Sequence, residues 1–169
     1  MKVNFRKTLI VFTPKSLLRQ TISVSMVEDL TEGFFQRLIP DVLMDEKQVK
    51  KLVFCSGKFY YDLVDARAKK NLNDVAIVRI EQLFPLDKMY IKELIEKYNA
   101  EELVWVQEEP ENMGAWLMIR HRLEKVLNET KKGYKLNVVA RFPSAAPAGG
   151  YQKYHQIRQK EIVTKALEL

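Results

Sequence analysis

Two adjacent carboxylates, Glu108 and Glu109, are the first candidates for chemistry in this sequence. They follow an apolar run at residues 103–106, which places them at the carboxyl end of a predicted strand, where α/β sheets often bind ligands. Neighbours along a strand point to opposite faces, so the two are not a ready-made acid and base pair. We predict that one of them pairs with a basic residue or a helix start, and a direct role in chemistry is the alternative.

Ser56 and Gly57 join a predicted strand to a predicted helix. Such a junction is similar to a phosphate-binding turn, because backbone N–H groups at the start of a helix attract anions. The segment lacks the glycine pattern of either nucleotide-binding fingerprint. We therefore interpret it as a tight turn, with anion binding as the alternative.

The other reactive side chains are one cysteine and two histidines. Cys55 lies inside an apolar strand pattern, which favours a buried structural thiol over a reactive one, and a single cysteine excludes an internal disulfide. His121 and His155 have no second ligand three or four residues away, which favours surface or interface histidines over metal ligands. The sequence contains no Gly-x-Ser-x-Gly elbow and no P-loop, so no complete catalytic set is recognised.

Composition indicates a single globular domain that buries its own core. The 169 residues are 47% hydrophobic and 30% charged. No apolar run approaches the ~20 residues of a membrane span, and the start of the chain lacks the apolar core of a signal peptide. We expect a soluble cytoplasmic protein, in the bacterial cytosol rather than the mitochondrial matrix. The net charge of +6 is dispersed among acidic residues, so we expect neither nucleic acid nor membrane as a partner.

The stretch 75–87 is the centre of the predicted fold. Residues 75–80 are almost entirely apolar and β-branched, which is typical of a strand buried on both faces of a parallel sheet. Pro85 ends the strand, and Asp87 is placed to cap the helix that follows. The same plan recurs along the chain. The predicted strands cover residues 8–12, 51–55, 75–80, 103–106 and 136–141.

Helical periodicity between these strands favours an α/β sheet flanked by helices. A capping box from Ser25 to Glu28 predicts the start of the first helix. We predict a loop or single turn at residues 15–21 and an exposed connection at residues 40–50. The predicted inward faces are Val27, Leu30, Phe34 and Leu38; Phe59, Leu63 and Ala66; Ile91, Leu94, Ile95 and Tyr98; Trp116, Ile119, Leu123 and Val126; and Tyr154, Ile157, Val163 and Leu167.

The loop at residues 142–151 contains small residues and two prolines. Such a loop lets the backbone approach another group closely, because few side chains stand in the way. A neighbouring domain, another subunit and a ligand are all possible contacts for it.

Several blocks of the sequence resemble one family. They are residues 12–19 (FTPKSLLR), 55–62 (CSGKFYYD), 75–83 (VAIVRIEQL), 105–110 (WVQEEP) with 114–116 (GAW), and 141–151 (RFPSAAPAGGY). In this order they are similar to the carboxyl-terminal part of the thiamine-diphosphate-dependent decarboxylating component of the 2-oxoglutarate dehydrogenase complex. The resemblance implies a transketolase C-terminal-like fold: a three-layer α/β sandwich with a five-stranded, mostly parallel sheet in which one strand is reversed.

The resemblance also implies a place in a longer polypeptide. Residues 1–169 would be one domain, with a lead-in strand, helix and linker at 1–50 and the main βα repeats at 51–169. The parent enzyme would decarboxylate 2-oxoglutarate oxidatively in the tricarboxylic acid cycle and succinylate the lipoyl group of its acyltransferase partner. Thiamine diphosphate and magnesium would be held by the preceding N-terminal and central domains. We therefore expect no catalytic, cofactor-binding or metal residue here, and an isolated chain without activity.

Support of a homodimer and regulation are the roles that the resemblance implies for this domain. Some family members bind acetyl-CoA or AMP, and Lys15, Arg19, Gln82 and Lys88 are the positions expected to hold such an anion. The segment 87–89 replaces an arginine-rich run of some regulated relatives, and surface or interface roles for all four residues are the alternative. The competing function is an independent α/β module that binds a nucleotide or another anion at its strand ends.

Overall fold

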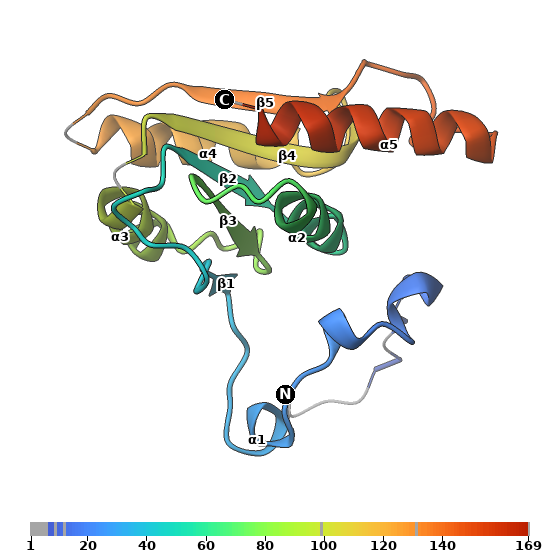
Figure 1. The fold of residues 1–169 in the computed structure, drawn as a ribbon, viewed down its shortest axis with the longest axis horizontal. Coiled ribbons are helices and arrows are strands. Elements are labelled where there is room, and N and C mark those ends of the chain that lie inside the picture. The colour runs from blue at the N-terminus through green and yellow to red at the C-terminus, as the bar shows by residue number, and fades with distance from the viewer. Residues whose placement is uncertain (1–6, 9, 12, 99, 131, 169) are drawn as a thin grey trace. The chain divides into compact units, whose positions relative to one another are not determined.

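A computed structural model describes residues 7–8, 10–11, 13–98, 100–130 and 132–168 and divides the chain into two units. The first unit, Met1–Gly33, contains short helical elements, and the second, Phe34–Leu169, contains the sheet and the long helices (Figure 1). The elements of the first unit are η1 (Lys15–Leu17), η2 (Thr21–Ser23) and α1 (Val27–Thr31). The single turn predicted near residue 15 is thus present as a 3-10 turn.

The second unit is built on a five-stranded sheet with the order β1-β3-β2-β4-β5. β1 is antiparallel to β3, and all other neighbours are parallel. This arrangement confirms the predicted α/β class, with a mostly parallel sheet and one reversed strand. The strands are β1 (Leu38–Ile39), β2 (Lys51–Cys55), β3 (Val75–Ile80), β4 (Glu102–Pro110) and β5 (Leu136–Arg141).

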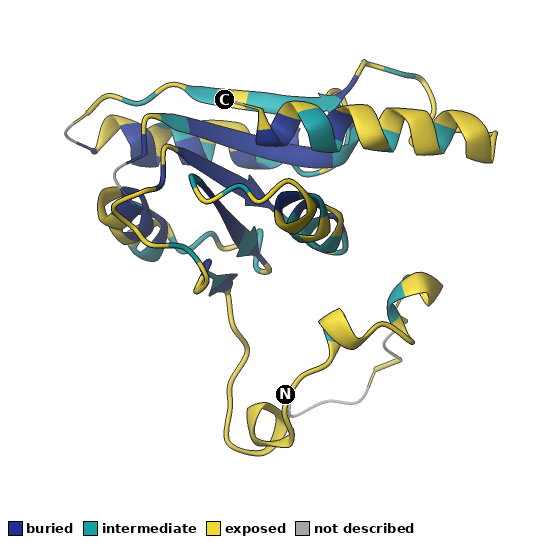
Figure 2. Cartoon of the chain, viewed as in Figure 1, coloured by how far each residue is buried: buried dark blue, intermediate teal, exposed yellow. Residues whose placement is uncertain are grey.

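Helices cover both faces of the sheet and make three layers (Figure 1). Successive side chains of a strand point to opposite faces, so Leu52 and Phe54 of β2 pack under α3 and α4, whereas Val53 and Cys55 pack under α2 and α5. Figure 2 shows the resulting burial of the central strands. The helices are α2 (Phe59–Lys69), α3 (Lys88–Tyr98), α4 (Trp116–Asn128) and α5 (Gln152–Leu167).

The connection from β3 to α3 forms as predicted. Asp87 accepts a hydrogen bond on Oδ1 from the backbone N–H of Tyr90 at 3.2 Å, which caps the first turn of α3. Asp87 also pairs with Arg37 at 3.0 Å. The cap therefore fixes the start of α3 against the chain that enters β1.

The first strand was predicted at the wrong place. Thr8, Ile10 and Val11 lie outside any strand, and residues 9 and 12 are outside the described residues. The reversed strand is instead β1, where Leu38 pairs with Ile80. Leu38 is 1% exposed, so burial at the sheet edge selects this short apolar pair over the longer run near the start of the chain.

The first helix is shorter than predicted, and its inward face is wrong. α1 ends at Thr31, and Val27, Leu30 and Phe34 are exposed. The cap is also shifted by one residue, because Asp29 accepts from the backbone N–H of Met26 at 3.0 Å rather than Glu28 capping Ser25. A helix of five residues buries too little surface to be stabilised by packing, which explains why periodicity failed here.

Two further assignments need correction. The segment 40–50 is not a wholly exposed connection, because Asp41 and Val49 are buried. In α5, Tyr154 and Ile157 are exposed rather than inward, and only the carboxyl-terminal half, with Ile162 and Leu167, packs on the sheet (Figure 2). The period of a helix identifies its apolar face but not how much of its length lies over the sheet.

Candidate functional site

Polar side chains from four elements meet at the carboxyl ends of β4 and β5. Lys58, just before α2, pairs with Glu108 of β4 at 2.5 Å. Gln159 of α5 donates from Nε2 to Asp62 at 2.8 Å and to Glu108 at 3.3 Å. These hydrogen bonds and the ion pair of Lys58 with Glu108 join α2, β4 and α5, in addition to their apolar packing.

Arg141 extends this network to β5. Its Nη2 donates to Oε1 of Gln159 and to Nδ1 of His155, both at 3.0 Å. A guanidinium has no acceptor, so Nδ1 of His155 must be the acceptor, which leaves the imidazole neutral with its proton on Nε2. We call Lys58, Asp62, Glu108, Arg141, His155 and Gln159 the carboxyl-edge network.

A second polar cluster lies at the end of β3. Arg79 pairs with Glu81 at 3.0 Å and donates to the hydroxyl of Tyr61 at 3.0 Å. Its guanidinium also lies 4.8 Å from the centre of the Tyr60 ring, a cation–π distance. Arg79 is therefore held by a carboxylate, a hydroxyl and an aromatic face within its own domain.

The reactive groups considered first have structural roles. Glu108 pairs with a lysine, which confirms the prediction that one of the two carboxylates pairs with a basic residue. Cys55 is fully buried, and this burial raises the pKa of its thiol, so it remains protonated and unreactive at neutral pH. Gly57 has a φ of 62°, as a tight strand-to-helix turn requires.

The predicted regulatory residues lie in different environments. Lys15 and Arg19 are exposed in the first unit. Gln82 donates from its side chain to the carbonyl of Pro85 at 2.7 Å, so part of its amide is already occupied. Lys88 is exposed at the start of α3. Within the second unit, Gln82 and Lys88 thus flank one turn, and the structure does not place the first pair relative to them.

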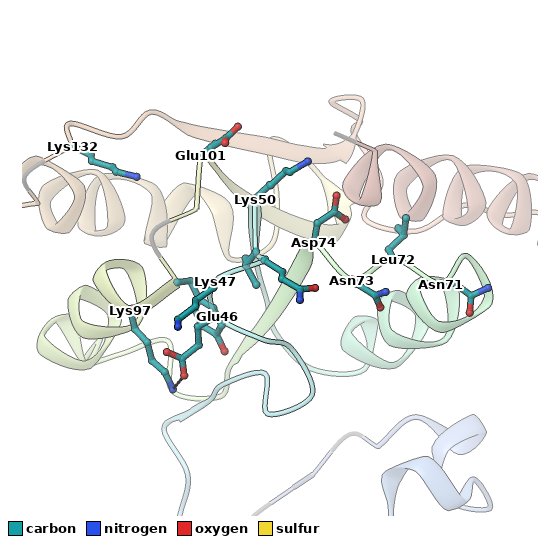
Figure 3. A pocket seen from close by; sticks show the side chains of 13 residues that line it. Glu46, Lys47, Lys50, Asn71, Leu72, Asn73, Asp74, Lys97, Glu101 and Lys132 are labelled. Atoms are coloured by element: carbon teal, nitrogen blue, oxygen red, sulfur yellow. Dashed lines mark ion pairs between the residues drawn. The ribbon is translucent and has the colours of Figure 1, made fainter.

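A broad hollow of about 1050 Å³ lies at the opposite edge of the sheet, beside the amino ends of β2 to β4. Its side chains come from several loops and from the end of α3, and they do not converge on one point (Figure 3). Glu46 pairs with Lys97 at 2.8 Å, and the other charges include both signs, for example Lys50 and Asp74. This mixture of spread charges favours no class of ligand.

Sequence reasoning missed a buried ion pair between Asp41 and Arg67, whose side chains are each 4% exposed. Oδ2 of Asp41 also accepts from the backbone N–H of Ile77 at 2.9 Å, and its carbonyl accepts from the hydroxyl of Tyr98 at 2.7 Å. Asp41 therefore joins α2, β3 and α3. No sequence pattern identified Asp41, because a lone aspartate after a proline is typical of a turn.

Gln107 of β4 and Gln159 of α5 were also missed. Gln107 is 4% exposed and uses its whole amide: it accepts from Trp105 and Trp116 and donates to the carbonyls of Pro110 and Met113. A polar residue inside an apolar strand was the available signal for this role. In the part of the chain that the structure describes, no group of three or more acidic, histidine or cysteine side chains could hold a metal, and no helix has the length and hydropathy to span a membrane.

Comparison with known sequences identifies a family. The sequence model described as "2-oxoglutarate dehydrogenase C-terminal" matches residues 24–167. The chain is 44% identical to the 2-oxoglutarate dehydrogenase E1 component of Coxiella burnetii, over 98% of the chain and 18% of that protein. It is 44% identical to the E1 component of Azotobacter vinelandii, over 95% of the chain and 17% of that protein. It is 42% identical to the mitochondrial 2-oxoglutarate dehydrogenase of Caenorhabditis elegans, over 95% of the chain and 16% of that protein. The chain thus spans less than a fifth of the length of these relatives.

Proposed function

The chain belongs to the 2-oxoglutarate dehydrogenase C-terminal family, and on that premise we propose that it is the carboxyl-terminal domain of an E1 component. The whole protein would be an oxidoreductase that decarboxylates 2-oxoglutarate and succinylates the lipoyl group of its acyltransferase partner, in the cytoplasm of a bacterium. Identity of 44% over 98% of the chain carries the proposal. Within this assembly, the domain would act as a scaffold rather than as a source of reacting groups.

The internal pairing of the carboxyl-edge network supports a scaffold role. Glu108 is held by Lys58 and Gln159, and Gln159 also binds Asp62. Acid–base catalysis needs a group that is free to exchange a proton with the substrate, and these carboxylates are engaged inside the domain. The network therefore holds the sheet and its helices together in one shape.

Thiamine diphosphate and magnesium do not fit the residues described in this chain. A diphosphate-bound magnesium ion needs carboxylate or carbonyl ligands that are free to coordinate it. At the strand ends, Glu108 is paired with Lys58 and Glu81 with Arg79 instead. We propose that the preceding domains of the same polypeptide bind the cofactor, and no chemical step is assigned to it here.

Exposed apolar side chains support contact with the rest of the polypeptide. In the first unit, Leu30 is 80% exposed and Val24 is 74% exposed. In the second unit, Phe142 is 87% exposed in the loop that the sequence marks for close contact. Water-exposed apolar surface of this kind favours burial against a partner. We propose the preceding domains and a second subunit of the homodimer as those partners.

We also propose that a regulatory nucleotide binds at the turn after β3. Gln82 and Lys88 flank that turn, and Lys88 has an exposed ammonium group. Gln82 and Lys88 would contact the phosphates of acetyl-CoA or AMP, and Lys15 and Arg19 of the first unit are separate candidates for contact with such an anion. Calorimetric titration of both ligands into the parent enzyme, compared with a Lys88→Gln variant, tests this directly: equal affinity for the two proteins would rule out Lys88.

A chimaera tests the main proposal. The segment of the Azotobacter vinelandii E1 component that this chain matches, 17% of its length, is replaced by the 169 residues. We expect oxidation of 2-oxoglutarate by the chimaera but not by the same protein with that segment deleted. The isolated chain should neither bind thiamine diphosphate nor turn over 2-oxoglutarate with an artificial electron acceptor. A folded but inactive chimaera, or micromolar binding of thiamine diphosphate to the isolated chain, would contradict the proposal.

A further inference from the structure

Arg141 is a buried cation whose partners are all neutral. It is 9% exposed at the end of β5, and its Nη2 donates to His155 and Gln159. Its Nε is buried and has no hydrogen-bond partner among the residues that the structure describes. A buried charge without a counter-charge is unfavourable, and an unsatisfied donor adds to that penalty. The fold thus leaves a guanidinium that an anion would stabilise.

Two further cations lie beside Arg141. Arg158 and Lys165 of α5 line the same hollow, and among the described residues neither they nor Arg141 forms an ion pair. Among the described lining residues, Glu161 is the one acidic side chain, against three cations. The charge of this hollow is therefore positive, in contrast to the mixed charges of the larger hollow at the other edge.

The hollow has the size of a small chemical group. Its volume is about 160 Å³, below the ~300 Å³ at which pockets for drug-sized ligands begin. Phe142 and Ile162 provide an apolar wall beside the cations, and Lys165 lies 6.0 Å from the Phe142 ring centre. A site with these walls suits the anionic end of a ligand, with a few carbon atoms behind it, rather than a whole nucleotide.

The rim of the hollow is held in position without a ligand. Asn112 donates from its side chain to the carbonyl of Ser144 at 2.9 Å and accepts from the N–H of Ser144 at 3.0 Å. Ser144 is one of the lining residues. A rim fixed by two hydrogen bonds lowers the entropy lost on binding, because the loop is already ordered.

We propose that Arg141, Arg158 and Lys165 form a binding site for a small oxyanion, a carboxylate or phosphoryl group, at the end of β5. The guanidinium groups provide the donors that oxyanions accept, and Lys165 adds a positive charge. The neutral partners of Arg141 orient it without cancelling its charge. The site is separate from the turn that carries Gln82 and Lys88, and it does not depend on the proposed role of the whole protein.

Calorimetry on the 169-residue chain tests the site. Inorganic phosphate and acetate are titrated separately at constant ionic strength in chloride buffer, so that the two arms distinguish phosphoryl from carboxylate recognition. We expect saturable binding of one anion per chain. The double variant Arg158→Gln/Lys165→Gln should weaken it at least about tenfold, because two of the three cations are removed.

The matched control is Lys153→Gln/Lys160→Gln. It removes the same charge from exposed positions of α5 outside the lining of this hollow, so we expect binding within about twofold of the original chain. Arg158 and Lys165 are exposed, and equal melting temperatures of both double variants would show that the fold is retained. Equal weakening by the two variants, or no saturable binding of either anion, would overturn the proposal.

Discussion

Arg67 and Arg141 are both buried arginines, and their surroundings differ in charge. Arg67 donates from Nη1 to the carboxylate of Asp41 and to the carbonyl of Val75, the latter at 3.1 Å. Arg141 donates to a neutral imidazole and a neutral amide, and its Nε has no hydrogen-bond partner within the described part of the chain. One arginine is compensated inside the fold, and the other is not.

This difference distinguishes an arginine that stabilises the fold from one that can bind a ligand. A buried ion pair, such as Asp41 with Arg67, offers little net charge to an outside ligand because the carboxylate already compensates the guanidinium. A buried arginine with neutral partners keeps its charge available to an anion. Burial alone therefore does not reveal what a charged residue does, whereas the charge of its partners does.

Removal of the negative charge of Asp41 should have the largest effect. The Asp41→Asn variant leaves Arg67 buried without a counter-charge, and we expect the free energy of unfolding to fall by ~3–5 kcal/mol. Urea denaturation followed by circular dichroism measures this. The double variant Asp41→Leu/Arg67→Met should lose less, because no uncompensated charge remains, and a larger loss than in the single variant would refute the interpretation of this pair.

Removal of Arg141 should have a smaller effect on stability. The Arg141→Met variant leaves two acceptors without their donor but also removes an unsatisfied Nε–H, so we expect a loss of about 1–2 kcal/mol. Its melting temperature should also become independent of phosphate concentration, whereas that of the original chain should rise with phosphate. A loss as large as that for Asp41→Asn would mean that Arg141 is compensated like Arg67, and the comparison would fail.

The sequence predicted the parts of the fold that depend on long regular patterns. The strands at 51–55 and 75–80 form as predicted, because largely apolar runs in a parallel sheet have few alternatives. The predicted strand at 136–141 also forms, as a half-buried strand at the edge of the sheet. β1 was missed because it contains two residues, and its position is set by pairing with Ile80 and by the burial of Leu38. Such tertiary contacts leave no periodic signal in the chain.

The polar clusters were predictable only in part. Glu108 was identified from its place at a strand end, and its pairing with a base was predicted. The links from Arg141 to Gln159 and from Asp41 to Arg67 join residues of different elements, 18 and 26 positions apart. Their partners depend on how the helices pack on the sheet, which residue types alone do not specify.

Tyr98, which contacts Asp41, should make the stability of the protein depend on pH. Its hydroxyl donates to the carbonyl of Asp41 at 2.7 Å, and burial, together with the nearby Asp41 charge, raises its pKa from 10.0 to about 12. A pKa raised in the folded state means that stability is fully present below pH ~10 and falls as the pH rises toward about 12.

The Tyr98→Phe variant isolates this contribution. We expect it to lose about 1 kcal/mol at neutral pH, because one hydrogen bond to the Asp41 segment is removed. The stability difference between the original chain and the variant should shrink between pH 10 and 12, as measured by urea denaturation at each pH. A difference that stays constant across this range would show that ionisation of Tyr98 does not weaken the fold.

An exposed ion pair gives the smallest effect and the baseline for the comparison. Lys69 pairs with Asp65 at 2.5 Å on the surface of α2, with side chains 73% and 57% exposed. Lys69→Gln should change the free energy of unfolding by less than about 0.5 kcal/mol, because water screens the pair. A loss above 1 kcal/mol, measured by the same denaturation, would mean that burial is not what distinguishes Asp41 from an ordinary acidic residue.

The position of Asp41 also matters for how this protein avoids aggregation. β3 is strongly apolar, and β1 pairs with only its last two residues. The carboxylate of Asp41 takes the N–H of Ile77, which a strand from another molecule would need in order to add to the sheet. A single side chain thus completes the protection of a segment that, if its edge were open, would have the composition of an amyloid-forming strand.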